Sequence, residues 1–296
     1  EFGPTVEKAL MWMVNNQDAN GFFSGGDGNQ YSLPIAGYAM AEAYGMTKVP
    51  TLKDTAEKAI GIIIKGQHAS GGWTYKCAPG ERDDTSYMGW CAQSLKAAKI
   101  AGLENPGLED ALKKSINGFK KNAHPEGGFG YTGPGRGGLT SVGTLCMQLL
   151  GAGRDDACLK GLEVMKPWTC SWQNPDAIGK SRPLYFWYYA TQAKFQAGGD
   201  MWNSWNKMFS PELTRNQVVM KGAGVDGRDI GYWEAPGAAT KDNEPGRVYT
   251  TCLATLMLEV YYRYLPTFKP ADAEIKKEVE AGGNKDIDVQ IKIPGV

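Results

Sequence analysis

A short phrase of glycines and an aromatic residue recurs about every fifty residues and constrains the fold more than any other feature. Gly71-Gly72-Trp73-Thr74-Tyr75 and Gly127-Gly128-Phe129-Gly130-Tyr131 are close copies, and looser copies occur at Asn20-Gly21-Phe22-Phe23 and Gly231-Tyr232-Trp233. A repeat of this length marks one supersecondary unit whose apolar face is buried against its neighbours. We therefore expect a helical repeat protein.

Apolar spacing and capping residues predict five pairs of helices. The first helix of each pair is amphipathic, whereas the second is apolar on nearly all sides. Helices that are apolar all round are buried, so the second set is predicted to form an inner layer within a barrel of helices. The first helices are expected at 4–17, 51–67, 106–122, 155–166 and 201–220, and the second at 31–45, 84–101, 139–151, 183–197 and 247–264.

The repeat pattern stops after Pro266, which predicts one repeat domain over 1–266 and a polar linker with a tail over 267–296. Within the tail, Asp286–Ile293 alternates strictly between polar and apolar residues, as is typical of a β-strand with one apolar face. A strand alone is not stable. We expect it to lie on the helical body, to pair with another chain, or to continue into a further domain.

The overall composition argues against several classes of partner. The chain has 32 basic and 32 acidic residues, so its net charge attracts neither nucleic acid nor an anionic membrane. The longest apolar run, 60–64, is far shorter than the roughly 20 residues that span a bilayer. Six cysteines without a CxxC pair predict buried free thiols rather than a disulfide scaffold.

The compartment is not determined by the sequence. The chain lacks an initiator Met and begins almost inside a predicted helix. One interpretation is an exported or periplasmic bacterial protein whose signal has been removed.

Two of the repeated phrases extend into a longer motif. Gln67–Trp73 has the Q-x3-G-x-W form of the repeat in squalene–hopene and oxidosqualene cyclases, and Gln17–Phe23 has the same form with Phe for Trp. From about 1 to 266 the chain resembles the bacterial prenyltransferase and squalene-oxidase repeat proteins of the terpenoid cyclase and protein prenyltransferase superfamily. The resemblance implies an all-α fold, an α/α toroid of about five to six helix pairs around a central cavity, here followed by a short β-like tail.

A cluster of acidic residues follows Trp73. Asp83-Asp84-Thr85-Ser86 resembles the DxDDTA acid motif of class II terpene cyclases, which implies Asp83 as proton donor and Asp84 as its neighbour. Glu81 stands where the motif has its first Asp. Protonating an alkene requires carboxyl groups that share hydrogen bonds in a pocket without water. The alternative, which we favour, is a helix start in which one carboxylate caps the helix and the others complement its dipole.

Aromatic residues are concentrated on the predicted inner helices, where their faces suit an apolar ligand or a carbocation. Five consecutive aromatics at 185–189 span more than one helical turn, so only some of them can face a cavity. The aromatic candidates for cavity-lining or ligand-binding residues are Tyr87, Trp90, Tyr185, Tyr188, Tyr189 and Tyr249.

Charged residues also lie near the starts of the inner helices, which are expected to share one mouth. Arg182 and Arg247 are candidates to bind an anionic ligand there, together with Arg82 and Arg136. The alternative is that these arginines pair with nearby acids such as Glu234, which is itself a candidate ligand-binding residue.

No metal site and no cofactor are predicted. The only two histidines, His68 and His124, occupy equivalent places in successive units, so they are not expected to meet at one ion. The glycine-rich stretch 133–138 lacks the Lys and the preceding strand of a phosphate-binding loop.

Three functions remain open. The first is a binding module whose cavity or mouth accepts an apolar, peptide-like or glycan-like ligand. The second is a minimal class II terpene cyclase with Asp83 as proton donor. The third is a polysaccharide lyase or hydrolase that uses carboxylates such as Asp226, Asp229 and Glu234. We rank the binding module first because the cyclases that the chain resembles place their substrate between two domains, and this chain has one.

Overall fold

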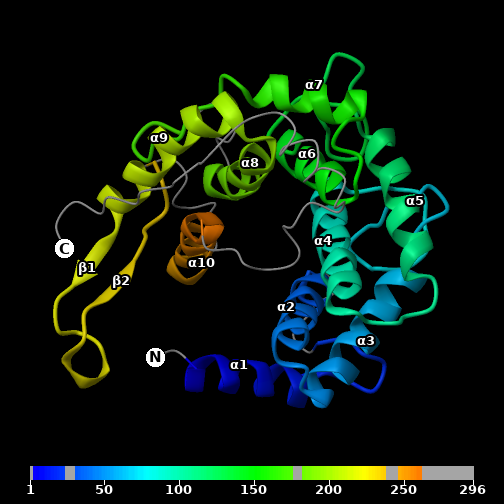
Figure 1. Ribbon diagram of the computed structural model, residues 1–296, viewed down its shortest axis with the longest axis horizontal. Coiled ribbons are helices and arrows are strands. Elements are labelled where there is room, and N and C mark those ends of the chain that lie inside the picture. The colour runs from blue at the N-terminus through cyan, green and yellow to red at the C-terminus, as the bar shows by residue number, and fades with distance from the viewer. Residues whose placement is uncertain (1–2, 24–30, 176–181, 238–245, 262–296) are drawn as a thin grey trace, which may run out of the picture.

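The computed structural model describes residues 3–23, 31–175, 182–237 and 246–261. Within these ranges the chain is mostly helical, with one small two-stranded sheet (Figure 1). The outer helices are α1 (Gly3–Asn16), α3 (Pro50–Lys65), α5 (Leu108–Lys121), α7 (Asp156–Met165) and α9 (Gly199–Asn216). The inner helices are α2 (Ser32–Thr47), α4 (Thr85–Ala101), α6 (Thr140–Leu149), α8 (Pro183–Ala197) and α10 (Arg247–Leu258), which continues as a 3-10 turn over Glu259–Tyr261.

The helices form two concentric layers (Figure 1). Each inner helix packs against the next one, in the order α2, α4, α6, α8 and α10, and the outer helices α3, α5 and α7 each bridge two inner helices. The inner helices thus form an arc that begins with α2 and ends with α10. Within the described ranges, extensive contacts between inner helices occur only between neighbours in this order. The architecture is thus the α/α toroid expected from the sequence, and the described residues form five helix pairs of it.

Burial separates the two layers as the apolar patterns predicted. Every residue of α4 except Lys99 and Ile100 is buried, because α2, α3, α5 and α6 surround this helix. By contrast, α1 has no buried residue, and its extensive contacts with the described helices are those with α3. An inner helix therefore has to be apolar on all sides, whereas an outer helix needs only an apolar stripe.

The glutamine of the repeated motif joins successive outer helices. Gln17 Nε2 donates to the carbonyl oxygen of Gly21 at 3.0 Å and to that of Thr55, in α3, at 2.9 Å. Gln67 Nε2 makes the same two bonds, to Gly71 at 3.0 Å and to Ala111, in α5, at 2.9 Å. One amide thus closes its own loop and holds the next outer helix.

The fifth repeat differs from the prediction. The outer helix expected over 201–220 ends at Asn216, and Val218–Met220 forms strand β1, which pairs antiparallel with strand β2 (Ile230–Tyr232). The β-branched pair at 218–219 favours a strand. The hairpin is an insertion between two parts of the unit that keep the contact of the second repeat, since Trp233 Nε1 donates to Leu213 O at 2.8 Å, as Trp73 Nε1 donates to Ile63 O at 2.7 Å.

The other predicted helix bounds agree with the structure within two residues, apart from the end of 247–264. That end, the boundary at 266 and the alternating segment Asp286–Ile293 lie outside the described residues. No helix within the described ranges combines the length and the apolar character needed to cross a bilayer.

We predict that Gly71→Ala lowers the free energy of unfolding by roughly 3 kcal/mol or more. Gly71 has φ +96°, and a Cβ there would lie 1.9 Å from the carbonyl oxygen of Lys114 in α5. Gly102→Ala is the matched control, because Gly102 also has positive φ (+79°) but nothing within 4 Å of its Cβ position, so its cost should be about 1 kcal/mol. Urea unfolding of both variants measures the difference, and equal losses would contradict the close approach of loop and helix.

Candidate functional site

A cavity of about 570 Å³ lies at the starts of the inner helices. All five inner helices, or the residues just before them, contribute to its wall, and two further residues come from the repeated loops. Its lining is mainly aromatic and comprises Tyr31, Ile35, Tyr75, Ser86, Trp90, Tyr131, Leu139, Arg182, Tyr185, Phe186 and Tyr249. The sequence predicted that the inner helices start around one shared opening. In the structure this opening is an aromatic pocket.

Tyrosine hydroxyls form one side of this cavity. Tyr31 OH hydrogen-bonds to Ser86 Oγ at 2.7 Å, and Tyr75 OH hydrogen-bonds to Tyr131 OH. The rings of Tyr31 and Tyr75 also pack against each other and against Tyr87, with centroids 5.4 to 6.0 Å apart. The cavity thus combines apolar ring faces with a few fixed hydroxyl groups, as small-molecule sites commonly do.

These hydroxyls keep their protons at neutral pH. Burial raises the pKa of Tyr75 to about 12 and raises the pKa of Tyr31, Tyr131 and Tyr185 still further above the ordinary value. The negative charge of the nearby Asp84 carboxylate adds to each of these shifts. A ligand therefore meets neutral hydroxyls that can donate or accept.

Asp84 caps helix α4 behind these tyrosines. Its Oδ1 accepts from the backbone N–H groups of Ser86 and Tyr87, both at 3.1 Å, and from Ser86 Oγ at 2.5 Å. Its Oδ2 is fully buried, with Arg82 Nη2 3.9 Å away, and the side chain also hydrogen-bonds to the hydroxyls of Tyr75 and Tyr131. This carboxyl group therefore caps α4 and contacts the tyrosine side of the cavity.

Asp83 has a different environment. Its Oδ1 is bound by His68 Nδ1 and by Ser70 Oγ, both at 2.8 Å, and its Oδ2 forms an ion pair with Lys121 Nζ at 3.0 Å. His68 Nε2 faces the carbonyl oxygen of Ala78 at 3.2 Å. Both ring nitrogens of His68 thus face oxygen atoms, and the Asp83 carboxyl group lies between this imidazole and the Lys121 ammonium.

The Asp83 cluster also holds the loop that leads into α4. Lys121 Nζ donates to Glu81 O at 3.0 Å, and Asn122 Nδ2 donates to Asp83 O at 3.1 Å and to Thr85 Oγ1 at 2.9 Å. Glu81 itself is exposed. The motif singled out in the sequence therefore contains one surface residue, one ion-paired anchor and one helix cap.

The structure places only part of the predicted aromatic set on the cavity wall. Trp90, Tyr185 and Tyr249 line it, whereas Tyr87, Tyr188 and Tyr189 are fully buried in the core and are not among the lining residues. Tyr188 stacks on Trp90 with ring centroids 6.0 Å apart, so it supports the wall from behind.

The predicted charged residues are also divided. Arg182, just before α8, lines the cavity. Arg247 and Glu234 pair with each other, with Nη2 and Oε1 2.7 Å apart, and neither lines the cavity. For Arg247 and Glu234, the structure therefore shows the alternative in which the arginine pairs with a nearby acid.

Sequence reasoning missed Tyr31, Tyr75 and Tyr131. A signal for two of them was present, because Tyr75 and Tyr131 occupy the last position of the two closest copies of the repeated phrase. The fold turns these two phrases so that their final tyrosines reach the cavity, whereas the final aromatics of the looser copies, Phe23 and Trp233, are buried in the core.

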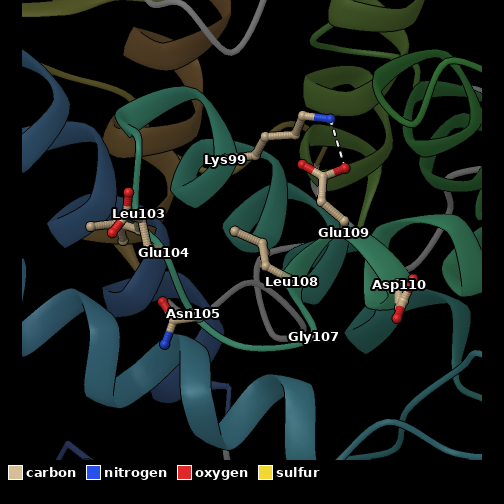
Figure 2. A pocket seen from close by; sticks show the side chains of 8 residues that line it. All are labelled: Lys99, Leu103, Glu104, Asn105, Gly107, Leu108, Glu109 and Asp110. Atoms are coloured by element: carbon tan, nitrogen blue, oxygen red, sulfur yellow. Dashed lines mark hydrogen bonds and ion pairs between the residues drawn. The ribbon is translucent and has the colours of Figure 1, made fainter.

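The other features offer less. No group of three or more His, Cys, Asp or Glu side chains within the described ranges could hold a metal ion. A smaller pocket of about 290 Å³ lies at the far end of α4, where Lys99 and Glu109 point toward one another and pair at 2.9 Å (Figure 2). The wall of this smaller pocket is mainly polar and includes the charged residues Lys99, Glu104, Glu109 and Asp110. It therefore does not suit an extended apolar ligand.

Comparison with known proteins supports the fold. No family model matches the chain, and no curated protein matches its sequence. In structure the chain is similar to the type II terpene cyclase MstE from Scytonema, with 13% identity, a TM-score of 0.55, and coverage of 95% of this chain and 76% of the cyclase. It is also similar to a glycoside hydrolase family 76 mannosidase from Bacteroides thetaiotaomicron VPI-5482, with 10% identity, a TM-score of 0.57, and coverage of 94% and 84%.

A third similar structure is an inactive variant of an α-1,6-mannanase of Salegentibacter sp. HEL1_6, in complex with α-1,6-mannotetrose. It has 14% identity and a TM-score of 0.51, and the alignment covers 91% of this chain and all of the mannanase. At these identities the likeness shows the terpenoid cyclase-like α/α-toroid fold, which carries different activities in different proteins.

We predict that Asp83→Ala is much more destabilising than Asp84→Ala. Removing Asp83 leaves the buried His68, Ser70 and the Lys121 ammonium without their shared partner and should cost roughly 3 kcal/mol, whereas losing the Asp84 cap should cost about 1 kcal/mol. Urea unfolding at pH 7 measures both values. A larger loss for Asp84→Ala would show that the two carboxylates had been assigned the wrong roles.

Proposed function

We propose that this protein binds an extended apolar ligand of the isoprenoid kind in the tyrosine-lined cavity. The observation that carries the proposal is the cavity itself, about 570 Å³ of space between the inner helix starts. Its volume falls within the roughly 300–1,000 Å³ of small-molecule sites. Its wall consists mainly of aromatic rings. Such a wall binds an apolar ligand, whose surface it shields from water, better than a strongly hydrated one.

One of the similar proteins supports this choice. A variant of the cyclase MstE is in complex with its substrate geranylgeranyl dihydroxybenzoate, a long apolar chain with a polar aromatic end. The cavity described here likewise has an apolar wall with a few hydroxyl groups at one side and Arg182 in its lining.

Glycan cleavage is less well supported. It generally requires two carboxyl groups that flank the bond to be broken. Asp229 pairs with Lys221 at 2.6 Å, and Glu234 pairs with Arg247. None of the three carboxylates considered for this function, Asp226, Asp229 and Glu234, lines the cavity.

The prediction is that Ile35→Trp blocks the ligand. Ile35 lines the cavity and is 40% exposed, so a larger side chain fits there without unfolding α2 but occupies the ligand's space. Binding of a fluorescent farnesol analogue, followed by anisotropy, should weaken at least tenfold. Met46→Trp is the matched control, because Met46 lies on the same helix, is 65% exposed and does not line the cavity. Wild-type protein that binds no isoprenoid, or a variant that binds as well as wild type, would contradict the proposal.

A second candidate function is acid-initiated cyclisation of such a ligand, and the buried carboxyl group of Asp84 beside the cavity tyrosines favours it. The rings of Trp90, Tyr185 and Tyr249 would face the resulting carbocation. The donor proposed here is Asp84 rather than Asp83, because Asp83 is turned toward His68 and Lys121.

For this candidate we predict that Asp84→Asn keeps binding but loses turnover. Asn caps a helix about as well as Asp, so α4 should remain folded while the acidic proton is lost. Incubation with linear polyprenols, followed by mass spectrometry of cyclised products, measures turnover, and anisotropy measures binding. Wild-type protein without any product, or an Asp84→Asn variant that still forms it, would remove the cyclase and leave the binding function standing.

A further inference from the structure

The hairpin of β1 and β2 exposes apolar side chains on both strands. Val218, Val219 and Met220 are 36%, 47% and 45% exposed, and Ile230 is 42% exposed. The hairpin projects beyond the helical arc (Figure 1). Two strands of three residues bury too little to be stable alone in water, and an apolar edge strand in solvent is a template for further pairing. The hairpin therefore requires a cover.

The open edge belongs to β1. Strand β2 contacts α10, and the residue after it, Trp233, is buried. In Figure 1 β2 lies on the side of α10 and β1 lies on the outer side. The sheet consists of β1 and β2 alone within the described ranges, so the outer edge of β1 has no partner strand there.

We propose that the segment Asp286–Ile293 of the same chain pairs with the outer edge of β1 as a third strand. Ile287, Val289, Ile291 and Ile293 alternate with Asp286, Asp288, Gln290 and Lys292, so a strand over these residues has one apolar and one polar face. The apolar face of such a strand is stabilised by apolar neighbours on the adjacent strand. Strand β1 offers apolar side chains on both faces of the sheet, Val219 on one face and Val218 and Met220 on the other.

The connecting chain is long enough for this pairing. Tyr261 lies on α9, where its hydroxyl hydrogen-bonds to Asn206 and its ring packs on Trp202 and Phe209 with centroids 5.8 and 6.1 Å away. Helix α9 leads directly into β1, and the distance from Asn206 to Val218 along it is roughly 18 Å. The 24 residues from 262 to 285 can span up to ~80 Å when extended. The tether thus reaches β1 with ample slack.

Hydrogen–deuterium exchange of the full chain tests the pairing. In wild-type protein, the amides of 218–220 should exchange slowly. The double variant Val289→Asp with Ile291→Asp places charges on the apolar face of the segment and should speed that exchange at least tenfold. Gln290→Asp is the matched control, since it adds the same charge on the polar face and should leave exchange unchanged. The amides of α4 report whether the helical body stays folded in each variant.

Two results would overturn the proposal. Exchange at 218–220 that is as fast in wild type as in the double variant would mean that the segment does not cover β1. Protection that disappears on dilution, together with a dimeric mass in light scattering, would mean that a second copy of the chain supplies the strand. Neither result bears on ligand binding in the cavity.

Discussion

Close approach between each glycine loop and the next outer helix is the contact on which the rest of the toroid depends. A Cβ at Gly71 would meet the backbone of Lys114 in α5, and a Cβ at Gly127 would meet the backbone of Lys160 in α7. Gly21 has the equivalent place against Lys58 in α3, at a slightly longer distance. Because backbone meets backbone, the separation and angle of successive helix pairs are set by loops that admit no side chain. The amides of Gln17 and Gln67 then hold this spacing by hydrogen bonds.

The same loops build the cavity. The chain that leaves each loop returns to an inner helix start, and Asp84 N donates to Trp73 O at 2.8 Å while Thr85 N donates to Tyr131 O at 2.9 Å. Two loops from different repeats thereby meet at the start of α4, and the tyrosines at their ends, Tyr75 and Tyr131, come together on the cavity wall. The glycine loops that set the spacing of the outer helices thus also position the hydroxyl groups of Tyr75 and Tyr131 on the cavity wall.

Two adjacent carboxylates have opposite environments at this point. A residue at the N-cap position turns its side chain back onto the first helical amides, so Asp84 faces the beginning of α4 and the cavity tyrosines. Asp83 precedes it and faces away, toward His68 and Lys121. One carboxyl group anchors a loop through these two residues, and the other caps α4 beside the hydroxyls of Tyr75 and Tyr131. Neighbours in sequence therefore have distinct surroundings because their side chains leave the backbone in different directions.

The sequence by itself determined the helix pairs, their bounds and their division into two layers, because apolar periodicity and capping residues are local signals that each helix carries independently. It also indicated the start of α4 as a place of interest and named Trp90, Tyr185, Tyr249 and Arg182 for the cavity. The helix predicted over 201–220 included the residues of strand β1 (218–220), since an inserted strand has no counterpart in the other repeats. Only the tertiary structure decided that Tyr31, Tyr75 and Tyr131 share one wall, that Tyr188 and Tyr189 lie behind it, and that His68 and Lys121 neutralise Asp83. These are contacts between residues tens of positions apart, and their geometry depends on how neighbouring repeats rotate about the glycine loops, which no single repeat specifies.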